Sequence, residues 1–95
     1  AIMYLYRLLE QINPSEMVQF NKAIATGFAE GPQRGTEALL NIKGLENNAY
    51  YHTALGDFFA QLKDPNNAKT HYETAILLTK SKAEWQLIWK KIEML

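Results

Sequence analysis

The sequence contains no cysteine and no excess of charge of either sign, since ten basic side chains balance ten acidic ones. Without cysteine the chain can have no thiolate nucleophile, zinc ribbon or disulfide framework. Without net charge it has no long-range field to attract a phosphate backbone. No apolar run approaches the ~18 residues of a membrane-spanning helix, and residues 1–12 carry Arg7 and Glu10 where a signal peptide would stay apolar. These absences favour a cytoplasmic domain with no membrane contact.

What is present is enough apolar material for one core: 47% of the 95 residues are hydrophobic and 12% are aromatic. A chain of this length hides roughly 60 to 68% of its unfolded surface, so it needs no structural metal. We therefore expect a single domain over residues 1–95. Residues 1–9 read as a helix already under way with no capping residue before it, which indicates a segment of a longer protein.

Helix-start signals, in which a capping side chain or a glycine comes before a proline or an acidic residue, recur along the chain. They lie at Asn13-Pro14, Gly31-Pro32, Asp64-Pro65 and Ser81 to Glu84, and Asn47 and Asn48 can start a further helix. The helices expected from these signals cover residues 2–12, 14–29, 32–43, 48–62, 65–79 and 81–94.

Apolar residues recur at helical spacing in these segments, and we take them as core faces. They are Met17, Phe20, Ile24 and Phe28; Leu39, Leu40 and Ile42; Tyr51, Leu55, Phe58, Phe59 and Leu62; Tyr72, Ala75 and Ile76; and Trp85, Ile88, Trp89, Ile92 and Leu95. Because the connections are short, neighbouring helices should run antiparallel.

The spacing of the helix starts indicates a repeat. Pro14 and Asn48 lie 34 residues apart, and Pro32 and Pro65 lie 33 apart, which is the length of a tetratricopeptide unit. In the second unit the family pattern is matched by His52, Leu55, Gly56, Phe59, Ala68, Tyr72 and Ala75. The sequence thus predicts an all-α fold of tetratricopeptide-like stacked antiparallel hairpins with about six helices. The last helix, which places Trp89 at a glycine position, would cap the stack.

The first unit departs from this pattern, since it places Asn21 and Lys22 at the leucine and glycine positions of the first helix. Asn21 and Asp57 are polar beside apolar stripes, where an unpaired group would be costly. We therefore expect both to join the hairpins through hydrogen bonds.

A second resemblance is carried by residues that follow a known family order: Pro14-Ser15, Val18, Asn21-Lys22-Ala23, Gly31-Pro32, Tyr51-His52, Asp57, Ala68, Tyr72 and Ala75-Ile76. Over most of its length the chain resembles the C-terminal extension of extracytoplasmic-function (ECF) RNA polymerase sigma factors. Lys22 departs from that family by replacing its usual arginine. The resemblance marks Asn21, Lys22, Tyr51, His52, Asp57 and Tyr72 as family-pattern or interaction positions.

This resemblance implies an accessory, regulatory domain of a protein that directs promoter-specific transcription initiation. Its partners would be its own sigma domains, the RNA polymerase core or a regulatory protein. The sigma domains that bind promoter DNA would lie upstream, and this segment itself would not contact DNA. The alternative is a tetratricopeptide adaptor that binds a peptide or protein unrelated to transcription.

No motif in the sequence indicates catalysis, a cofactor or a metal. His52 and His71, the only two histidines, lie on different expected helices and lack metal-ligand spacing. Tyr50, Tyr51 and Phe58 are candidates for a partner groove, although residues of this type are more often core. Lys90 and Lys91 read as a solvated helix end that complements the helix dipole. A small helical enzyme is the third class of function that the sequence leaves open. Such an enzyme would show substrate turnover that is lost in His52→Ala.

Overall fold

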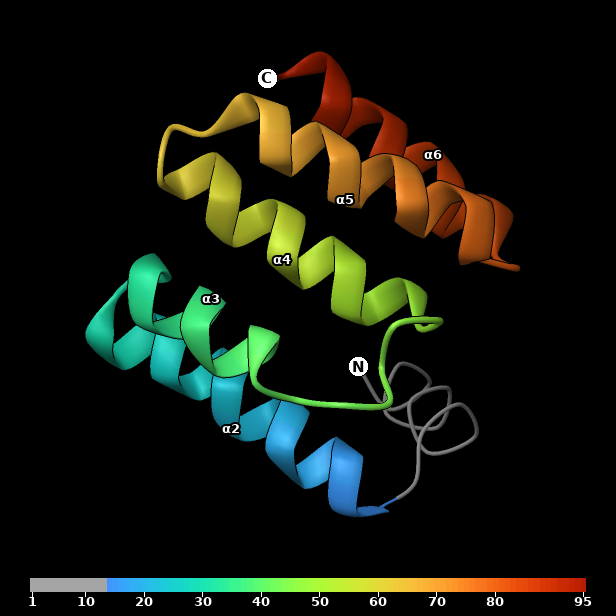
Figure 1. Ribbon diagram of the computed structural model, residues 1–95. Helices are drawn as coiled ribbons and strands as arrows, with labels where there is room; N and C mark the ends of the chain where they lie inside the picture. Colours follow the sequence, from blue (N-terminus) through green and yellow to red (C-terminus); the bar gives the residue numbers. More distant parts are fainter. Residues whose placement is uncertain (1–13) are drawn as a thin grey trace.

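The computed structural model describes residues 14–95, and this part of the chain is all-helical. The helices are α2 (Pro14–Glu30), α3 (Pro32–Leu40), α4 (Ala49–Gln61), α5 (Pro65–Leu78) and α6 (Lys82–Glu93). Successive helices lie side by side in a stack, with α2 at one end and α6 at the other (Figure 1). The all-α prediction is confirmed for these residues. The expected helix 2–12 and the cap at Asn13 lie outside them.

The helix starts follow the local chemistry of their caps. The Asn48 side chain accepts hydrogen bonds from the backbone N–H groups of Tyr50 and Tyr51, at 2.9 and 3.2 Å. Asp64 accepts from the N–H of Asn67 at 3.2 Å. Each cap satisfies amide groups that the first helical turn leaves without a partner.

The α3 helix ends at Leu40, three residues before the expected end at 43. The chain turns there: the N–H of Ile42 donates to the carbonyl of Leu39. Ile42 and Leu45 both turn inward from the connection to α4 and are 6% and 1% exposed. Burial of these two side chains by way of the connection accounts for the early end.

Two close approaches between helices depend on glycine. A Cβ on Gly35 of α3 would lie 2.7 Å from the Cα of Gly27 on α2, and the Phe58 ring fills the space beside both glycines. A Cβ on Gly56 of α4 would lie 2.5 Å from the Tyr72 ring of α5. Both hairpins therefore pack more closely than any side chain larger than hydrogen would allow.

The core consists of two clusters of buried side chains. The first joins α2, α3 and α4 through Phe20, Ala23, Leu39, Ile42, Leu45, Tyr50, Tyr51, Leu55 and Phe58. The second joins α5 and α6 through Ala68, Tyr72, Ala75 and Ile88. Phe59 of α4 packs against both clusters and links them.

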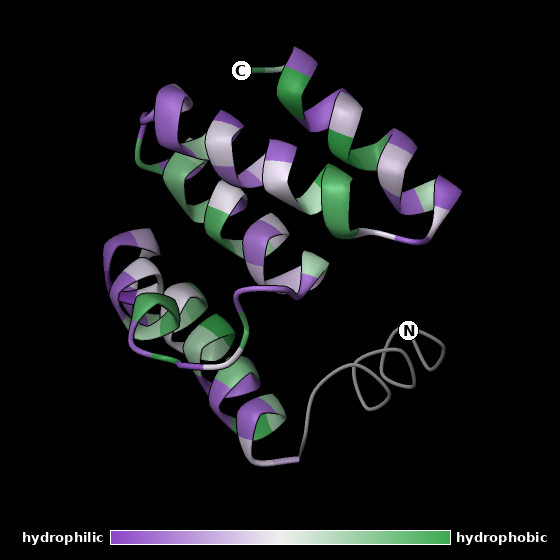
Figure 2. Cartoon of the chain, turned by 45° about the vertical axis from the view of Figure 1, so that its right-hand side comes forward, coloured by the Kyte–Doolittle hydropathy of each residue, from purple (hydrophilic) through white to green (hydrophobic). Residues whose placement is uncertain are grey.

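Several residues expected in the core are exposed. Phe28 and Leu40 are 80% and 55% exposed, and Trp85 and Trp89 are 44% and 39% exposed. Phe28 follows Gly27 and lines a groove described below. The two indoles contact each other edge to face on α6, with centroids 6.0 Å apart, where no described helix lies beyond them. Figure 2 shows apolar residues recurring along this last helix. The expectation that both indoles are core is wrong.

None of the helices in residues 14–95 combines the length and apolar character that crossing a bilayer requires.

Candidate functional site

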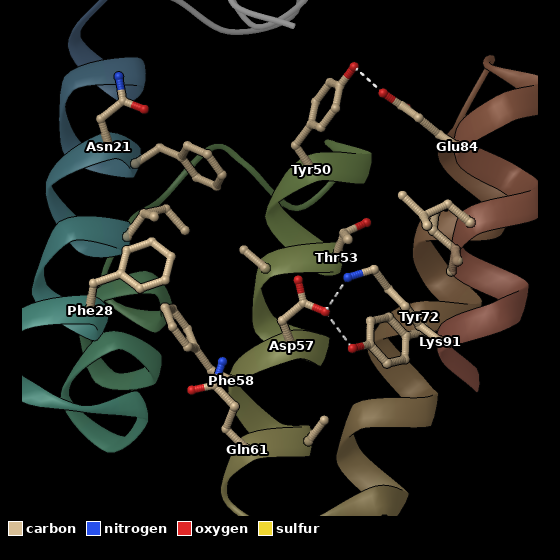
Figure 3. A pocket seen from close by; sticks show the side chains of 16 residues that line it. Asn21, Phe28, Tyr50, Thr53, Asp57, Phe58, Gln61, Tyr72, Glu84 and Lys91 are labelled. Atoms are coloured by element: carbon tan, nitrogen blue, oxygen red, sulfur yellow. Dashed lines mark hydrogen bonds and ion pairs between the residues drawn. The ribbon is translucent and has the colours of Figure 1, made fainter. Parts of the chain in front are cut away.

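A groove in the surface of residues 14–95 has α4 as its floor and α2 and α6 as its two walls (Figure 3). Its volume is about 730 Å³. The walls and floor are thus formed by alternate helices of the stack, and Tyr72 of α5 also lines the groove. The residues that carry its chemistry are Asn21, Ile24 and Phe28 from α2; Asp57, Phe58 and Gln61 from α4; and Glu84, Leu87 and Lys91 from α6.

One end of the groove is apolar. Phe28 points from α2 toward α4 (Figure 3) and is 80% exposed. Ile24 precedes it by one turn, and Phe58 forms the buried base. Leu87, on the opposite wall, is 55% exposed. An exposed phenylalanine and leucine facing one hollow are typical of a surface that binds another protein.

The centre of the groove holds a polar cluster that joins three helices. Oδ1 of Asp57 on α4 accepts a hydrogen bond from the Tyr72 hydroxyl of α5 at 2.5 Å and another from Nζ of Lys91 on α6 at 2.8 Å. Burial, followed by the hydrogen bond to Asp57, raises the pKa of Tyr72, so the phenol keeps its proton and remains a donor. Lys91 lies in the last turn of α6, as expected, and in addition forms an ion pair with Asp57 that was not predicted from the sequence.

A second polar contact lies where α6 begins. The Tyr50 hydroxyl of α4 donates to Oε1 of Glu84 at 2.6 Å, and the Thr79 hydroxyl donates to Oε2 at 3.1 Å. Ser81 caps α6 by accepting from the N–H of Glu84 at 3.3 Å. Ser81 thus caps α6 as expected, while its own N–H donates to the Thr79 hydroxyl at 3.2 Å. The Glu84 carboxylate fixes the start of α6 to α4.

Behind the groove, His52 and His71 are in contact. Their Nδ1 atoms lie 3.1 Å apart, and Nε2 of His52 lies 2.7 Å from the carbonyl oxygen of Glu46. His52 is 9% exposed. Neither histidine lines the groove. This contact was not predictable from the sequence, because 19 residues separate the two histidines and they lie on different helices.

The structure brings together only some of the predicted positions. Asp57 and Tyr72 are bonded to each other, as the expectation of a joining role for Asp57 requires. Asn21 faces the groove but is exposed, and within residues 14–95 its side chain bonds no other helix, so the joining role expected of it is wrong. Lys22 is exposed beside it on α2. Tyr51 is 7% exposed in the core.

Tyr50 and Phe58, which were considered as exposed groove residues, are 7% and 3% exposed. Both still line the groove, as its buried base. The residue that sequence reasoning missed is Phe28, since its place in an apolar stripe is equally typical of core and of groove. Over residues 14–95, no three histidine, aspartate or glutamate side chains converge to hold a metal ion.

Comparison with known proteins gives one informative similarity. The chain is 32% identical over 93 residues to an uncharacterized protein of Rhizobium meliloti (strain 1021). The alignment covers 96% of this chain and 22% of that protein, so the chain spans about a fifth of the length of the curated relative it matches. No protein-family model matches the sequence, and no solved structure matches the fold.

Proposed function

We propose that this chain is a tetratricopeptide-like protein-interaction domain that acts by contact and without catalysis. The observation that carries the proposal is the groove between α2, α4 and α6, which combines an exposed apolar wall with fixed polar groups. Such a surface suits a peptide segment, because apolar anchors provide affinity and polar groups fix orientation.

The α4–α5 hairpin supports tetratricopeptide-like stacking. Ala68 and Ala75 are fully buried, and Tyr72 packs against Gly56, at the positions of the repeat pattern. The first hairpin is a variant of this arrangement. Its close contact is between Gly35 of α3 and Gly27 of α2. In the repeat pattern the glycine position of that first helix is occupied by Lys22 instead. In this proposal α2, α4 and α6 are the first helices of successive units, and they line the binding face.

The parent protein, in this proposal, is an ECF-type sigma factor that directs promoter-specific transcription initiation in the cytoplasm. The order of family-pattern residues supports this, and two of them, Asp57 and Tyr72, form the hydrogen bond at the centre of the groove. The occupant of the groove would be a segment of the parent's own sigma domains. A segment with one large apolar side chain between Phe28 and Leu87 fits the apolar end.

A binding titration with matched variants tests the proposal. The purified sigma domains of the parent protein would be titrated into this chain and its variants by calorimetry. Phe28→Ser should weaken binding tenfold or more, as loss of a hot-spot aromatic does. Leu77→Ser is the matched control, since Leu77 is 85% exposed on α5 and lies outside the groove. It should leave affinity unchanged.

The tetratricopeptide adaptor is the alternative, and the same variants distinguish it. The adaptor is favoured if neither the sigma domains nor the polymerase core binds, while a peptide from another pathway does bind. If Phe28→Ser abolishes binding of that peptide, the groove is a binding site and the transcription role is wrong. Equal loss of binding in Phe28→Ser and Leu77→Ser would contradict the groove itself.

A further inference from the structure

The two histidines form a contact that joins three parts of the fold. His52 lies on α4, His71 lies on α5, and Glu46 belongs to the connection that leads from α3 into α4. The Phe59 ring covers His71, with centroids 5.5 Å apart and planes within 7°. The contact therefore fastens the second hairpin to the segment that joins it to the first.

The hydrogen-bond partners determine where the protons lie. A backbone carbonyl only accepts, so Nε2 of His52 must carry the proton that it donates to Glu46. In a neutral His52 the other nitrogen, Nδ1, is then an acceptor. The Nδ1 of His71, 3.1 Å away, must be the donor. For the neutral pair, one arrangement of protons satisfies both contacts. The Nδ1–H of His71 donates to Nδ1 of His52, and the Nε2–H of His52 donates to the carbonyl of Glu46.

We propose that the His52–His71 pair is a pH-sensitive clamp that holds α5 to the start of α4 and releases it when both imidazoles are protonated. A single added proton can bind Nε2 of His71 and leave the clamp closed. A second proton would have to bind Nδ1 of His52, where it would face the N–H of His71. Two donors and two positive charges cannot remain 3.1 Å apart, so the rings must separate.

The surroundings of the pair include buried apolar groups and a carboxylate. Burial, and next the charge of His52, lower the pKa of His71. The carboxylate of Glu46 is the charged group that acts on His52 from the connection, and hydrogen bonds to backbone N–H groups are the main cause of its own lowered pKa. From α4, Tyr51 presents its ring edge to His52 with centroids 5.2 Å apart. From α5 the facing group is His71 itself.

The sign of the pH dependence follows from linkage. Because the folded state lowers the pKa of His71, the unfolded chain binds more protons below the ordinary histidine pKa of ~6.5. The full contribution to stability is therefore present above that pH and falls as the solution is made more acidic. The chain has only two histidines, so between about pH 5.5 and 7 this change in stability reports on the clamp.

Nuclear magnetic resonance titration of the imidazoles in the full 95-residue chain tests the clamp. At pH 7.5 the ring nitrogens should show a proton on Nε2 of His52 and on Nδ1 of His71. His71 should titrate below ~6.5, and further acidification should shift the signals of Phe59 and Glu46 as the two rings separate. Gln86→His, which places an imidazole on an exposed part of α6, gives the reference midpoint of a free histidine.

Two substitutions at His71 separate the clamp from simple packing. Glutamine can donate to Nδ1 of His52 and can reverse its amide when His52 gains a proton, so His71→Gln should keep α4 and α5 joined at acidic pH. It should also reduce the slope of Tm between pH 5.5 and 7. His71→Phe fills the space without a donor and should lower Tm at pH 7.5 more than His71→Gln does. Titration of His71 at the reference midpoint, or a slope of Tm that His71→Gln leaves unchanged, would overturn the proposal.

Discussion

Replacement of Asp57 by alanine should destabilise the domain far more than the same change at the other polar groove residue that was expected to join the hairpins, Asn21. The substitution leaves the Tyr72 hydroxyl without its acceptor in a residue that is only 2% exposed. An unsatisfied buried donor costs ~1–3 kcal/mol. The lost ion pair adds little, because the side chains of Lys91 and Asp57 are 30% and 37% exposed, and pairs of that kind contribute ~0.2–1 kcal/mol.

We therefore expect Asp57→Ala to lower the free energy of unfolding by about 2–3 kcal/mol, most of it through Tyr72. The assay is urea denaturation followed by circular dichroism, with the slope checked for unchanged two-state behaviour. A double-mutant cycle with Tyr72→Phe isolates the hydrogen bond, and its coupling free energy should be about 1 kcal/mol or more. The cycle of Asp57→Ala with Lys91→Met should give a smaller coupling free energy. Added salt at about 0.5 M should reduce that coupling further, since salt screens exposed ion pairs.

Asn21→Ala is the matched control, because Asn21 is also a polar groove residue but bonds no other described helix. Its effect should stay within about 0.5 kcal/mol, as for exposed surface positions. The reasoning would be refuted if Asp57→Ala were equally mild, or if Asp57→Ala and Tyr72→Phe were simply additive.

Three further outcomes follow from the packing, the cap and the groove. Gly35→Ala would place a Cβ 2.7 Å from the Gly27 backbone. The resulting overpacking, about 1–3 kcal/mol, should outweigh the better helix propensity of alanine and lower Tm. An unchanged or higher Tm would contradict this. Ser81→Ala removes the α6 cap and should cost about 1 kcal/mol in urea unfolding, whereas no change would show that the cap contributes nothing. Phe28→Ser should leave Tm unaltered despite the loss of a large apolar side chain, because 80% of that residue is exposed; a large fall in Tm would place Phe28 in the core.

The helix boundaries were the most predictable part of the fold, because the signals that set them are local. Asn48, Asp64 and Ser81 each accept hydrogen bonds from the first turn of the helix they precede, as their sequence context predicted. The end of α3 was not predictable in this way. It depends on the burial of Ile42 and Leu45 by helices that lie elsewhere in the sequence.

The candidate site was predictable only in part. The polar character of Asp57 beside an apolar stripe indicated a joining role, which the bonds to Tyr72 and Lys91 confirm. The same argument failed for Asn21, since α2 turns that residue toward the open groove. An apolar stripe does not reveal whether its last member, here Phe28, meets a neighbouring helix or solvent.

The central claim is that the groove between α2, α4 and α6 binds a protein segment, and chemical-shift mapping tests it most directly. Isotope-labelled chain would be titrated with the purified sigma domains of its parent protein. If the groove is the binding site, saturable shifts should occur at Phe28, Gln61, Leu87 and Lys91, with none at Leu77 on α5. The absence of binding, or shifts centred on the outer faces of α3 and α5, would contradict it.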